Sequence, residues 1–184
     1  MKPVNVRFAG FGGQGIALAS VVLGRAAAVE GKHVIQTQSY GPEARGGASK
    51  GEVRISDQPI YYPGVTKPDV LVAMSAVAYN QYAGDAKTVL VNSTVGAPKG
   101  YTIPATPIAI ELGKHVVANM VMVGAVGGLT SIVSKESLER SIIALVPRGL
   151  RVVNLRAFRR GWEIGESLQA GDKPTKKELQ AGDK

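Results

Sequence analysis

The chain has no cysteine and only two histidines among its 184 residues, which limits the redox and metal chemistry it can carry by itself. Without cysteine it can neither form a disulfide nor ligate an iron–sulfur cluster through thiolates, so any such centre must lie on a partner. His33 and His115 lack the spacing to a second ligand that a metal site needs, so we expect both to be structural and no metal to be bound. The G-x-S-x-G turn of serine hydrolases is also missing.

Aromatic residues are scarce, at 5% of the chain, although the formal net charge is +8. The basic residues are scattered, and their densest group comprises Arg148, Arg151, Arg156, Arg159 and Arg160. The last three are spaced as on one helix face, which is typical of a solvated or subunit-contacting surface. Few aromatic rings lie among them to stack on bases, so we expect no nucleic-acid binding.

Long uninterrupted hydrophobic runs are absent. The most apolar stretch, residues 116–133, contains Asn119 and three glycines, so we expect a buried core helix and no membrane association. Gly124 and Gly128 would let its backbone approach either the sheet or a second copy of the chain, and packing within the chain is favoured. The first residues carry charge and no signal-peptide core, which predicts a cytoplasmic protein.

Strand-like and helix-like segments alternate along the chain, which is typical of a parallel sheet covered by helices. We predict strands near residues 4–9, 34–37, 53–55, 70–73, 88–91 and 101–103. Helices are expected at 15–29, ending at Gly31, at 135–145 after an N-cap at Ser134, and at 153–167. The sequence therefore predicts an α/β fold: a single Rossmann-like domain with a mostly parallel sheet flanked by helices.

Two segments do not fit this alternation of strands and helices. Residues 51–62 alternate in polarity and contain a turn signal, which predicts an antiparallel excursion, as a strand pair or at the sheet edge. Residues 168–184 contain the sequence Leu-Gln-Ala-Gly-Asp-Lys twice, too short a repeat to form its own core. We therefore expect one domain over residues 1–167 and a mobile C-terminal tail over 168–184.

The first predicted strand leads directly into a glycine-rich turn and a helix. Gly10, Gly12 and Gly15 have the G-x-G-x-x-G spacing that brings a backbone close to a phosphate, and Gly13 and Gln14 lie within it. The acidic residue that would hold a ribose at the end of the second strand is missing, which disfavours NAD. No Gly-Lys-Ser/Thr follows the turn, which disfavours nucleoside triphosphates. The turn thus predicts a general anion site.

A second polar loop follows the second strand. We expect both loops to leave the carboxyl ends of neighbouring parallel strands, so that Arg45 faces the same crevice as the first turn. Glu43 and Glu52 are candidate acids or bases, but a carboxylate beside Arg45 more often forms an ion pair. The candidate anion-binding residues are Gly10, Gly12, Gly13, Gln14, Gly15, Tyr40, Gly41, Glu43, Arg45, Gly46 and Gly47, and no catalytic residue is assigned.

Residues 10–15, Gly-Phe-Gly-Gly-Gln-Gly, and 36–47, Gln-Thr-Gln-Ser-Tyr-Gly-Pro-Glu-Ala-Arg-Gly-Gly, resemble the gamma subunit of the 2-oxoacid:ferredoxin oxidoreductases, most closely the 2-oxoglutarate type. The resemblance extends through residues 53–57, 67–74, 103–106 and 117–122 in the order that this family shows, and covers about residues 5–164. It implies a subunit of an enzyme that oxidatively decarboxylates a 2-oxoacid to an acyl-coenzyme A while reducing ferredoxin.

The resemblance also implies where the chemistry lies. Thiamine diphosphate and Mg²⁺ would be held by alpha and beta subunits, iron–sulfur clusters would lie on partners including a ferredoxin-like delta subunit, and coenzyme A would accept the acyl group. This chain would complete the assembly and place its two loops near coenzyme A. Family members that act on pyruvate carry several basic residues in the loop matching 43–47, whereas here only Arg45 is basic.

Two other functions stay open from the residues alone. One is a stand-alone nucleotide-binding α/β protein, and the other is a scaffold whose loops contact only protein. Whether the isolated chain forms a homodimer is also open.

Overall fold

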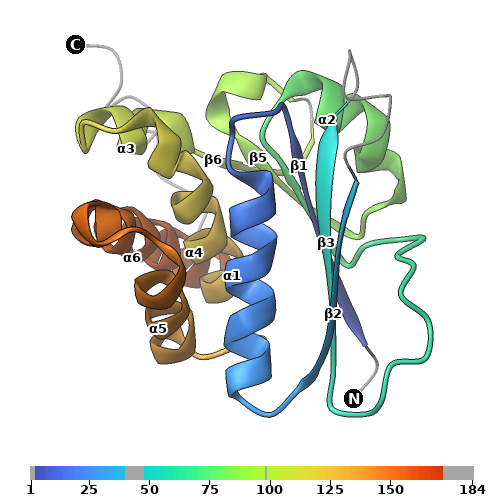
Figure 1. Cartoon of the computed structure of the whole chain (residues 1–184). Helices are drawn as coiled ribbons and strands as arrows, with labels where there is room; N and C mark the ends of the chain where they lie inside the picture. Colours follow the sequence, from blue (N-terminus) through green and yellow to red (C-terminus); the bar gives the residue numbers. More distant parts are fainter. Residues whose placement is uncertain (1–2, 40–47, 98, 172–184) are drawn as a thin grey trace.

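The computed structural model describes residues 3–39, 48–97 and 99–171. In that part of the chain six strands form one mixed sheet in the order β2-β3-β1-β4-β5-β6 (Figure 1). The strands are β1 (Val4–Gly10), β2 (His33–Ser39), β3 (Ser49–Ser56), β4 (Val70–Ala73), β5 (Thr88–Asn92) and β6 (Tyr101–Ile103). All six lie where the sequence predicts a strand, and β1, β4, β5 and β6 are parallel to one another, which confirms the mostly parallel α/β fold.

The position of β3 corrects two expectations. It pairs antiparallel with β1, Val6 opposite Val53, and with β2, Gln36 opposite Val53. The antiparallel segment is therefore real, but it lies inside the sheet and not at its edge, and residues 57–69 after it form no strand. The expectation that β1 and β2 are neighbours is wrong, because the chain returns from β2 and places β3 between them. Their carboxyl ends still reach the same edge, one strand apart.

Six helices accompany the sheet in the described residues. They are α1 (Ile16–Val29), α2 (Ala76–Tyr82), α3 (Ala105–Glu111), α4 (Ala118–Thr130), α5 (Lys135–Leu145) and α6 (Arg151–Gln169), with short 3-10 turns η2 (Ala83–Asp85), η3 (Ser93–Val95), η4 (His115–Val117) and η5 (Arg148–Leu150). As predicted, α1 ends just before Gly31, whose φ is 76°, and the Ser134 hydroxyl caps α5 by accepting a hydrogen bond from Ser137 N at 3.2 Å. α6 is two residues longer at each end than expected.

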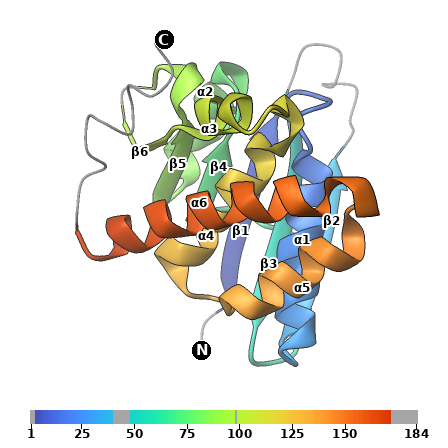
Figure 2. The same cartoon turned by 90° about the vertical axis from the view of Figure 1, so that its left-hand side faces the viewer.

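Five of these helices lie on one side of the sheet, where the larger core forms (Figures 1 and 2). Phe8, Val53, Val72 and Leu90 point from the strands into this core and are at most 1% exposed. α1 and α4 cover them directly, and α5 and α6 close the outer layer. This apolar layer excludes water from the middle of the sheet face, whereas Gln38 and Tyr101 at its two edges are exposed.

Glycines allow α4 and α6 to cross at short range. A Cβ added to Gly124 would lie 2.1 Å from Phe158 O, and one added to Gly161 would lie 1.9 Å from Val121 O. Gly128 and Gly165 make corresponding contacts one turn further along. The close approach expected of Gly124 and Gly128 is thus made within the chain, but to α6 and not to the sheet.

The opposite face carries a smaller core. Ala9, Leu71 and Val91 pack there against Tyr79 and Tyr82 of the short helix α2. In the described part of the chain, no helix is long and apolar enough to cross a membrane.

Candidate functional site

The turn after β1 is held to the end of β4 by one side chain. Gln14 Oε1 accepts a hydrogen bond from Phe11 N at 2.7 Å, and Gln14 Nε2 donates to Met74 O at 3.1 Å. Only glycine fits at position 10, because a Cβ there would lie 2.4 Å from Gln14 Oε1 and 2.8 Å from Met74 Cβ. Gln14, predicted as an anion contact, is therefore used to set the shape of the turn.

Gly15 joins this turn to α1 and to α4. Its φ of 71° is left-handed, which favours glycine, and Asn119 Nδ2 donates to Gly15 O at 3.1 Å. A Cβ on Gly15 would lie 2.2 Å from that nitrogen. Within the described chain, α1 has no side-chain N-cap, so its first main-chain N–H groups remain available to an anion.

Gly12 and Gly13 leave the turn open to solvent. Both are exposed, and a Cβ on either would meet no atom within 4 Å. A bound group can therefore approach the main chain closely here, as the glycine spacing predicts.

A crevice of about 440 Å³ lies against this turn. It is located beyond the carboxyl ends of β1 and β4, where the strand order reverses and open α/β sheets bind their ligands. Its lining residues are Gly13, Gln14, Met74, Thr106, His115, Val116 and Ala118.

Thr106 is held in the wall of this crevice by the end of β5. Thr106 N donates to Asn92 Oδ1 at 3.1 Å, and Asn92 Nδ2 donates to Thr106 Oγ1 at 2.7 Å. Both main-chain and side-chain groups of Thr106 are thus fixed by one buried amide, which gives this wall a defined shape.

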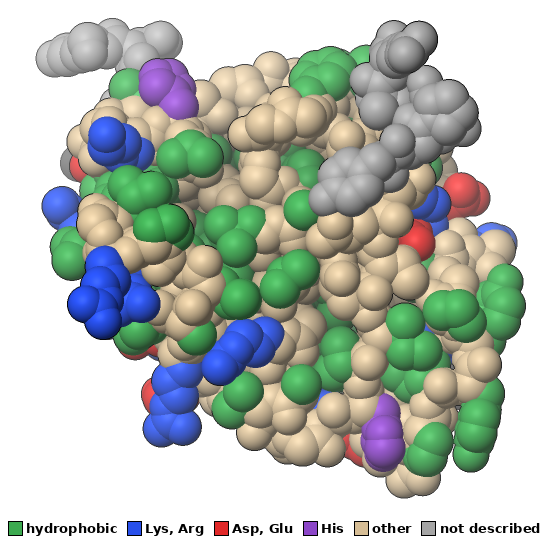
Figure 3. Space-filling view, viewed as in Figure 1, with side chains coloured by type: hydrophobic (Ala, Val, Ile, Leu, Met, Phe, Trp, Pro, Cys, Tyr) green, Lys and Arg blue, Asp and Glu red, His purple; other side chains and the backbone are tan. Residues whose placement is uncertain are grey.

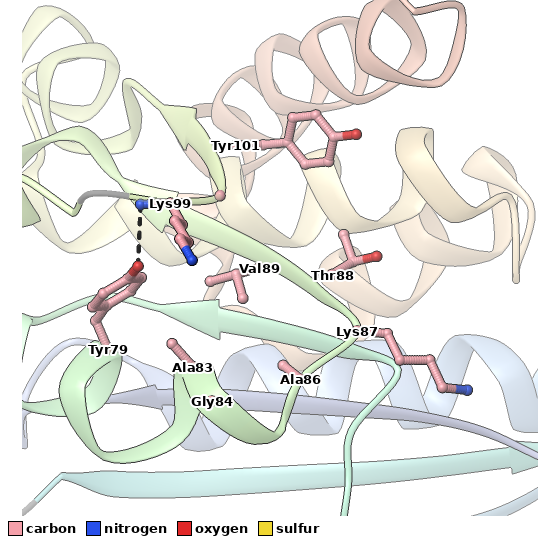
Figure 4. A pocket seen from close by; sticks show the side chains of 10 residues that line it. Tyr79, Ala83, Gly84, Ala86, Lys87, Thr88, Val89, Lys99 and Tyr101 are labelled. Atoms are coloured by element: carbon pink, nitrogen blue, oxygen red, sulfur yellow. Dashed lines mark hydrogen bonds between the residues drawn. The ribbon is translucent and has the colours of Figure 1, made fainter.

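A larger hollow, about 650 Å³, lies elsewhere, between α2, η2 and the first residues of β5 and β6 (Figure 4). Lys99 N donates to the Tyr79 hydroxyl at 3.2 Å along its rim. Because it is lined by the amino-terminal ends of these strands, it does not meet the glycine turn. We therefore assign the candidate site to the smaller crevice.

The structure brings five of the predicted residues together at the crevice or its turn, namely Gly10, Gly12, Gly13, Gln14 and Gly15. The other six, Tyr40, Gly41, Glu43, Arg45, Gly46 and Gly47, lie outside the described residues. His33 begins β2, whereas His115 is exposed and lines the crevice.

Sequence reasoning missed three site residues. Asn119, Asn92 and Thr106 position the turn and the crevice wall, and Asn119 and Asn92 had a local signal. Asn119 is a polar residue near the start of an apolar run, and its Oδ1 is buried with no partner among the described residues. Asn92 ends a buried strand at the carboxyl edge of the sheet.

Glu52, a candidate acid or base, is part of a buried ion pair on the other sheet face. Its Oε1 lies 2.6 Å from Arg7 Nε and 3.7 Å from Lys50 Nζ. The Arg7 guanidinium also lies 4.9 Å from the centre of the Tyr82 ring. Glu52 therefore neutralises cations within the fold, and the crevice does not include it.

The basic group predicted on the last helix is exposed and partly paired. Arg159 lies 2.7 Å from Glu139, and Arg160 lies 3.2 Å from Glu111. Among the described residues, no group of three or more His, Asp or Glu side chains is placed to hold a metal ion.

Most of this chain matches a protein family, curated relatives and solved structures. Residues 5–164 match the family of pyruvate ferredoxin/flavodoxin oxidoreductases. The KorC subunit of 2-oxoglutarate synthase from Methanocaldococcus jannaschii is 53% identical over 177 residues, covering 89% of this chain and 95% of that protein.

Two solved structures share the fold. The gamma subunit of a keto/oxoacid ferredoxin oxidoreductase from Geobacter sulfurreducens matches with a TM-score of 0.79 and 38% identity, over 89% of this chain and 99% of that one. The 2-oxoglutarate:ferredoxin oxidoreductase from Magnetococcus marinus, solved with 2-oxoglutarate, coenzyme A and succinyl-CoA bound, matches with a TM-score of 0.79 and 26% identity. That match covers 94% of this chain and 32% of the other.

Proposed function

Because this chain belongs to the pyruvate ferredoxin/flavodoxin oxidoreductase family, we propose that it is the gamma subunit of a multi-subunit 2-oxoglutarate:ferredoxin oxidoreductase. The observation that carries this proposal is the 53% identity to a subunit named for 2-oxoglutarate synthase, over 89% of this chain and 95% of that subunit. The complex would decarboxylate 2-oxoglutarate oxidatively, pass the electrons to ferredoxin and transfer the acyl group to coenzyme A.

The reacting groups of this complex would belong to other subunits. The chain has no cysteine for iron–sulfur clusters, so these would lie on partners, including a ferredoxin-like delta subunit. Thiamine diphosphate and Mg²⁺ would be bound by alpha and beta subunits in a cytoplasmic complex. This chain would contribute the domain expected over residues 1–167, extended to Gln169 by the end of α6, followed by the tail.

We further propose that the glycine turn lies against a phosphate group of coenzyme A. The fit rests on the open main chain at Gly12 and Gly13 and the uncapped start of α1, which together offer N–H donors to an anion. Arg45 with Gly46 and Gly47, and the neighbouring Tyr40, Gly41 and Glu43, are proposed to complete this site. A guanidinium can bind one phosphate through two hydrogen bonds.

Two variants of the reconstituted complex test the coenzyme A contact. Gly12→Ala places a methyl group between the turn and its ligand, and Arg45→Ala removes the guanidinium group. Each should raise the KM for coenzyme A by about tenfold, the equivalent of one charge-assisted hydrogen bond, and leave the KM for 2-oxoglutarate unchanged. Gly84→Ala, at another glycine with open space around it, is the matched control. Unchanged coenzyme A kinetics in both variants would refute the contact.

Co-purification tests the assembly itself. The chain expressed with its native partners should elute with a thiamine-binding pair and a small cysteine-rich subunit. Turnover of 2-oxoglutarate by the isolated chain, or stable binding of NAD to it, would instead favour the stand-alone enzyme. Titration of coenzyme A into the complex with and without this chain separates the proposed role from a pure scaffold, for which both titrations would agree.

A further inference from the structure

Residues 3–39, 48–97 and 99–171 leave one face of the sheet partly uncovered. On the side away from the large core, α2 packs against β1 and β4, whereas β2 and β3 make their main helix contacts with α1 on the other side. On this side of β2, Ile35 and Thr37 are half-buried and His33 is exposed. Sheets in α/β proteins are normally covered on both faces, and the described residues place only α2 on this side.

Two adjacent aromatic side chains project beside this face. Tyr61 is 93% exposed and Tyr62 is 66% exposed, and both belong to the segment 57–69 that follows β3. In the space-filling view, hydrophobic side chains gather at the right-hand side, over the place where Figure 1 shows this segment (Figure 3). Exposed neighbouring tyrosines are typical of protein interfaces, where they bury large area at low entropic cost.

The segment is held in shape by arginines of the sheet although it forms neither helix nor strand. Arg54 Nη1 donates to the main-chain oxygens of Tyr62 at 3.0 Å and Gly64 at 3.1 Å. Arg7 Nη2 donates to Val65 O at 2.7 Å. The tyrosines are therefore presented on a fixed main chain, so little further ordering is needed when a partner binds.

The charge of this surface is positive. Lys50 and Arg54 point to this side of β3, and the exposed Lys67 lies in the adjoining segment. Three carboxylates lie among them. Glu52 is paired with Arg7 and Asp69 with Lys87, at 2.5 Å, and Asp57 lies at the margin, so Lys50, Arg54 and Lys67 outnumber the remaining acidic group. A second copy of this chain would bring the same cations against them, whereas an acidic surface would be attracted.

We propose that the open face of β2 and β3, together with residues 57–69, docks an acidic surface of another subunit of the complex, with Tyr61 and Tyr62 as its anchors. This inference rests on the proposed function, because it requires a multi-subunit assembly. The proposed contact lies on the sheet face opposite α1, α3, α4, α5 and α6, apart from the glycine turn.

Site-specific cross-linking in the assembled complex tests the location. p-Benzoylphenylalanine replaces Tyr61 in one preparation and Tyr101, an exposed tyrosine of β6, in a matched control. Position 61 should cross-link to an acidic segment of a different subunit, identified by mass spectrometry, with a yield at least fivefold above position 101. Cross-links only to a second copy of this chain, or none at position 61 in an intact complex, would overturn the proposal.

Variants test the energetics. The triple variant Tyr61→Ser/Tyr62→Ser/Lys67→Glu should bind the remaining subunits at least tenfold more weakly, with unchanged thermal stability, because all three side chains are exposed. The control Tyr101→Ser/Arg140→Glu removes one exposed tyrosine and reverses one exposed charge elsewhere, and should bind within twofold of the native chain. Equal affinities for both variants would contradict the docking surface while leaving the proposed function intact. Failure of the native chain to assemble would instead refute the proposed function.

Discussion

The two faces of the central sheet differ in composition and in how completely the chain covers them. One face is apolar and lies under five helices, with strand residues such as Phe8 and Leu90 at most 1% exposed. The other carries the ion pair of Arg7 and Glu52 and two exposed tyrosines, and within the described residues α2 is the one helix that packs on it. The difference teaches that the chain completes its own core on one face and, in our proposal, leaves part of the other for an assembly partner.

The turn at the carboxyl edge connects these two faces. Gln14 and Asn119 tie it to β4 and α4, so its shape depends on the helix-covered face being intact. The proposed anion site can thus be rigid although its glycines are exposed. The helix-covered face thus supplies stability to the fold, and the other face is proposed to bind a partner. Substitutions on each face test this division.

The largest expected effect comes from the helix-covered face. Gly161→Val should destabilise the chain by about 4 kcal/mol or more, above the roughly 1–3 kcal/mol of ordinary overpacking, because its Cβ would meet the main chain of α4. The nearest atom, Val121 O, would be 1.9 Å away, and α4 and α6 cannot separate without exposing the core. Urea unfolding followed by circular dichroism measures the loss.

Gly149→Ala is the control for this prediction, since a Cβ at Gly149 meets nothing within 4 Å. It should change the free energy of unfolding by less than about 0.5 kcal/mol. Equal stability of the two variants would mean that α4 and α6 do not pack as described.

An intermediate effect is expected on the other face. Arg7→Met leaves Glu52 buried without its main partner and should cost about 3 kcal/mol, the lower end for a broken buried pair because Lys50 Nζ remains 3.7 Å away. Chemical denaturation of the purified chain measures this cost.

The double variant Arg7→Met/Glu52→Leu sharpens the result. It removes both charges, so most of the lost stability should return, although the Arg7 hydrogen bond to Val65 O is gone. A double variant as unstable as Arg7→Met would show that the cost arises from the lost arginine contacts and not from an unpaired carboxylate.

The smallest effect concerns Asp69, which lies just before β4. Burial alone would raise the pKa of its carboxyl group, but hydrogen bonds from Lys87 and Asn5 outweigh burial and hold the pKa below the ordinary value of 3.8. Asp69→Asn should therefore cost about 1 kcal/mol at neutral pH. Because the folded-state pKa is the lower one, this stabilisation is present above pH 3.8 and is lost as the pH falls through the folded-state value.

Urea unfolding of both chains over a pH series checks this sign, and Asp85→Asn, at an exposed carboxylate, is the matched control. The native chain and Asp69→Asn should converge in stability at acidic pH. A difference that persists or grows at low pH would contradict the assigned contacts.

Local patterns were sufficient for much of the fold. All six strands, the end of α1 at Gly31 and the cap at Ser134 were predicted, because each depends on residues close in sequence. The order of the strands was not, since the alternation in residues 51–62 predicts an antiparallel segment without indicating which strands it pairs with. The site shows the same limit, because the sequence did not indicate that Gln14 holds the turn to Met74, far along the chain. Its contact with a ligand stays a prediction.

The sequence by itself determined the succession of strands and helices, the glycine turn after β1 and the family to which the chain belongs, because these are written in runs of neighbouring residues. Only the tertiary structure decided that β3 separates β1 from β2, that α4 meets α6 through their glycines, and that Arg7 reaches Glu52. Each of these joins residues far apart in the chain, where the outcome depends on which surfaces exclude water together and which charges find a partner.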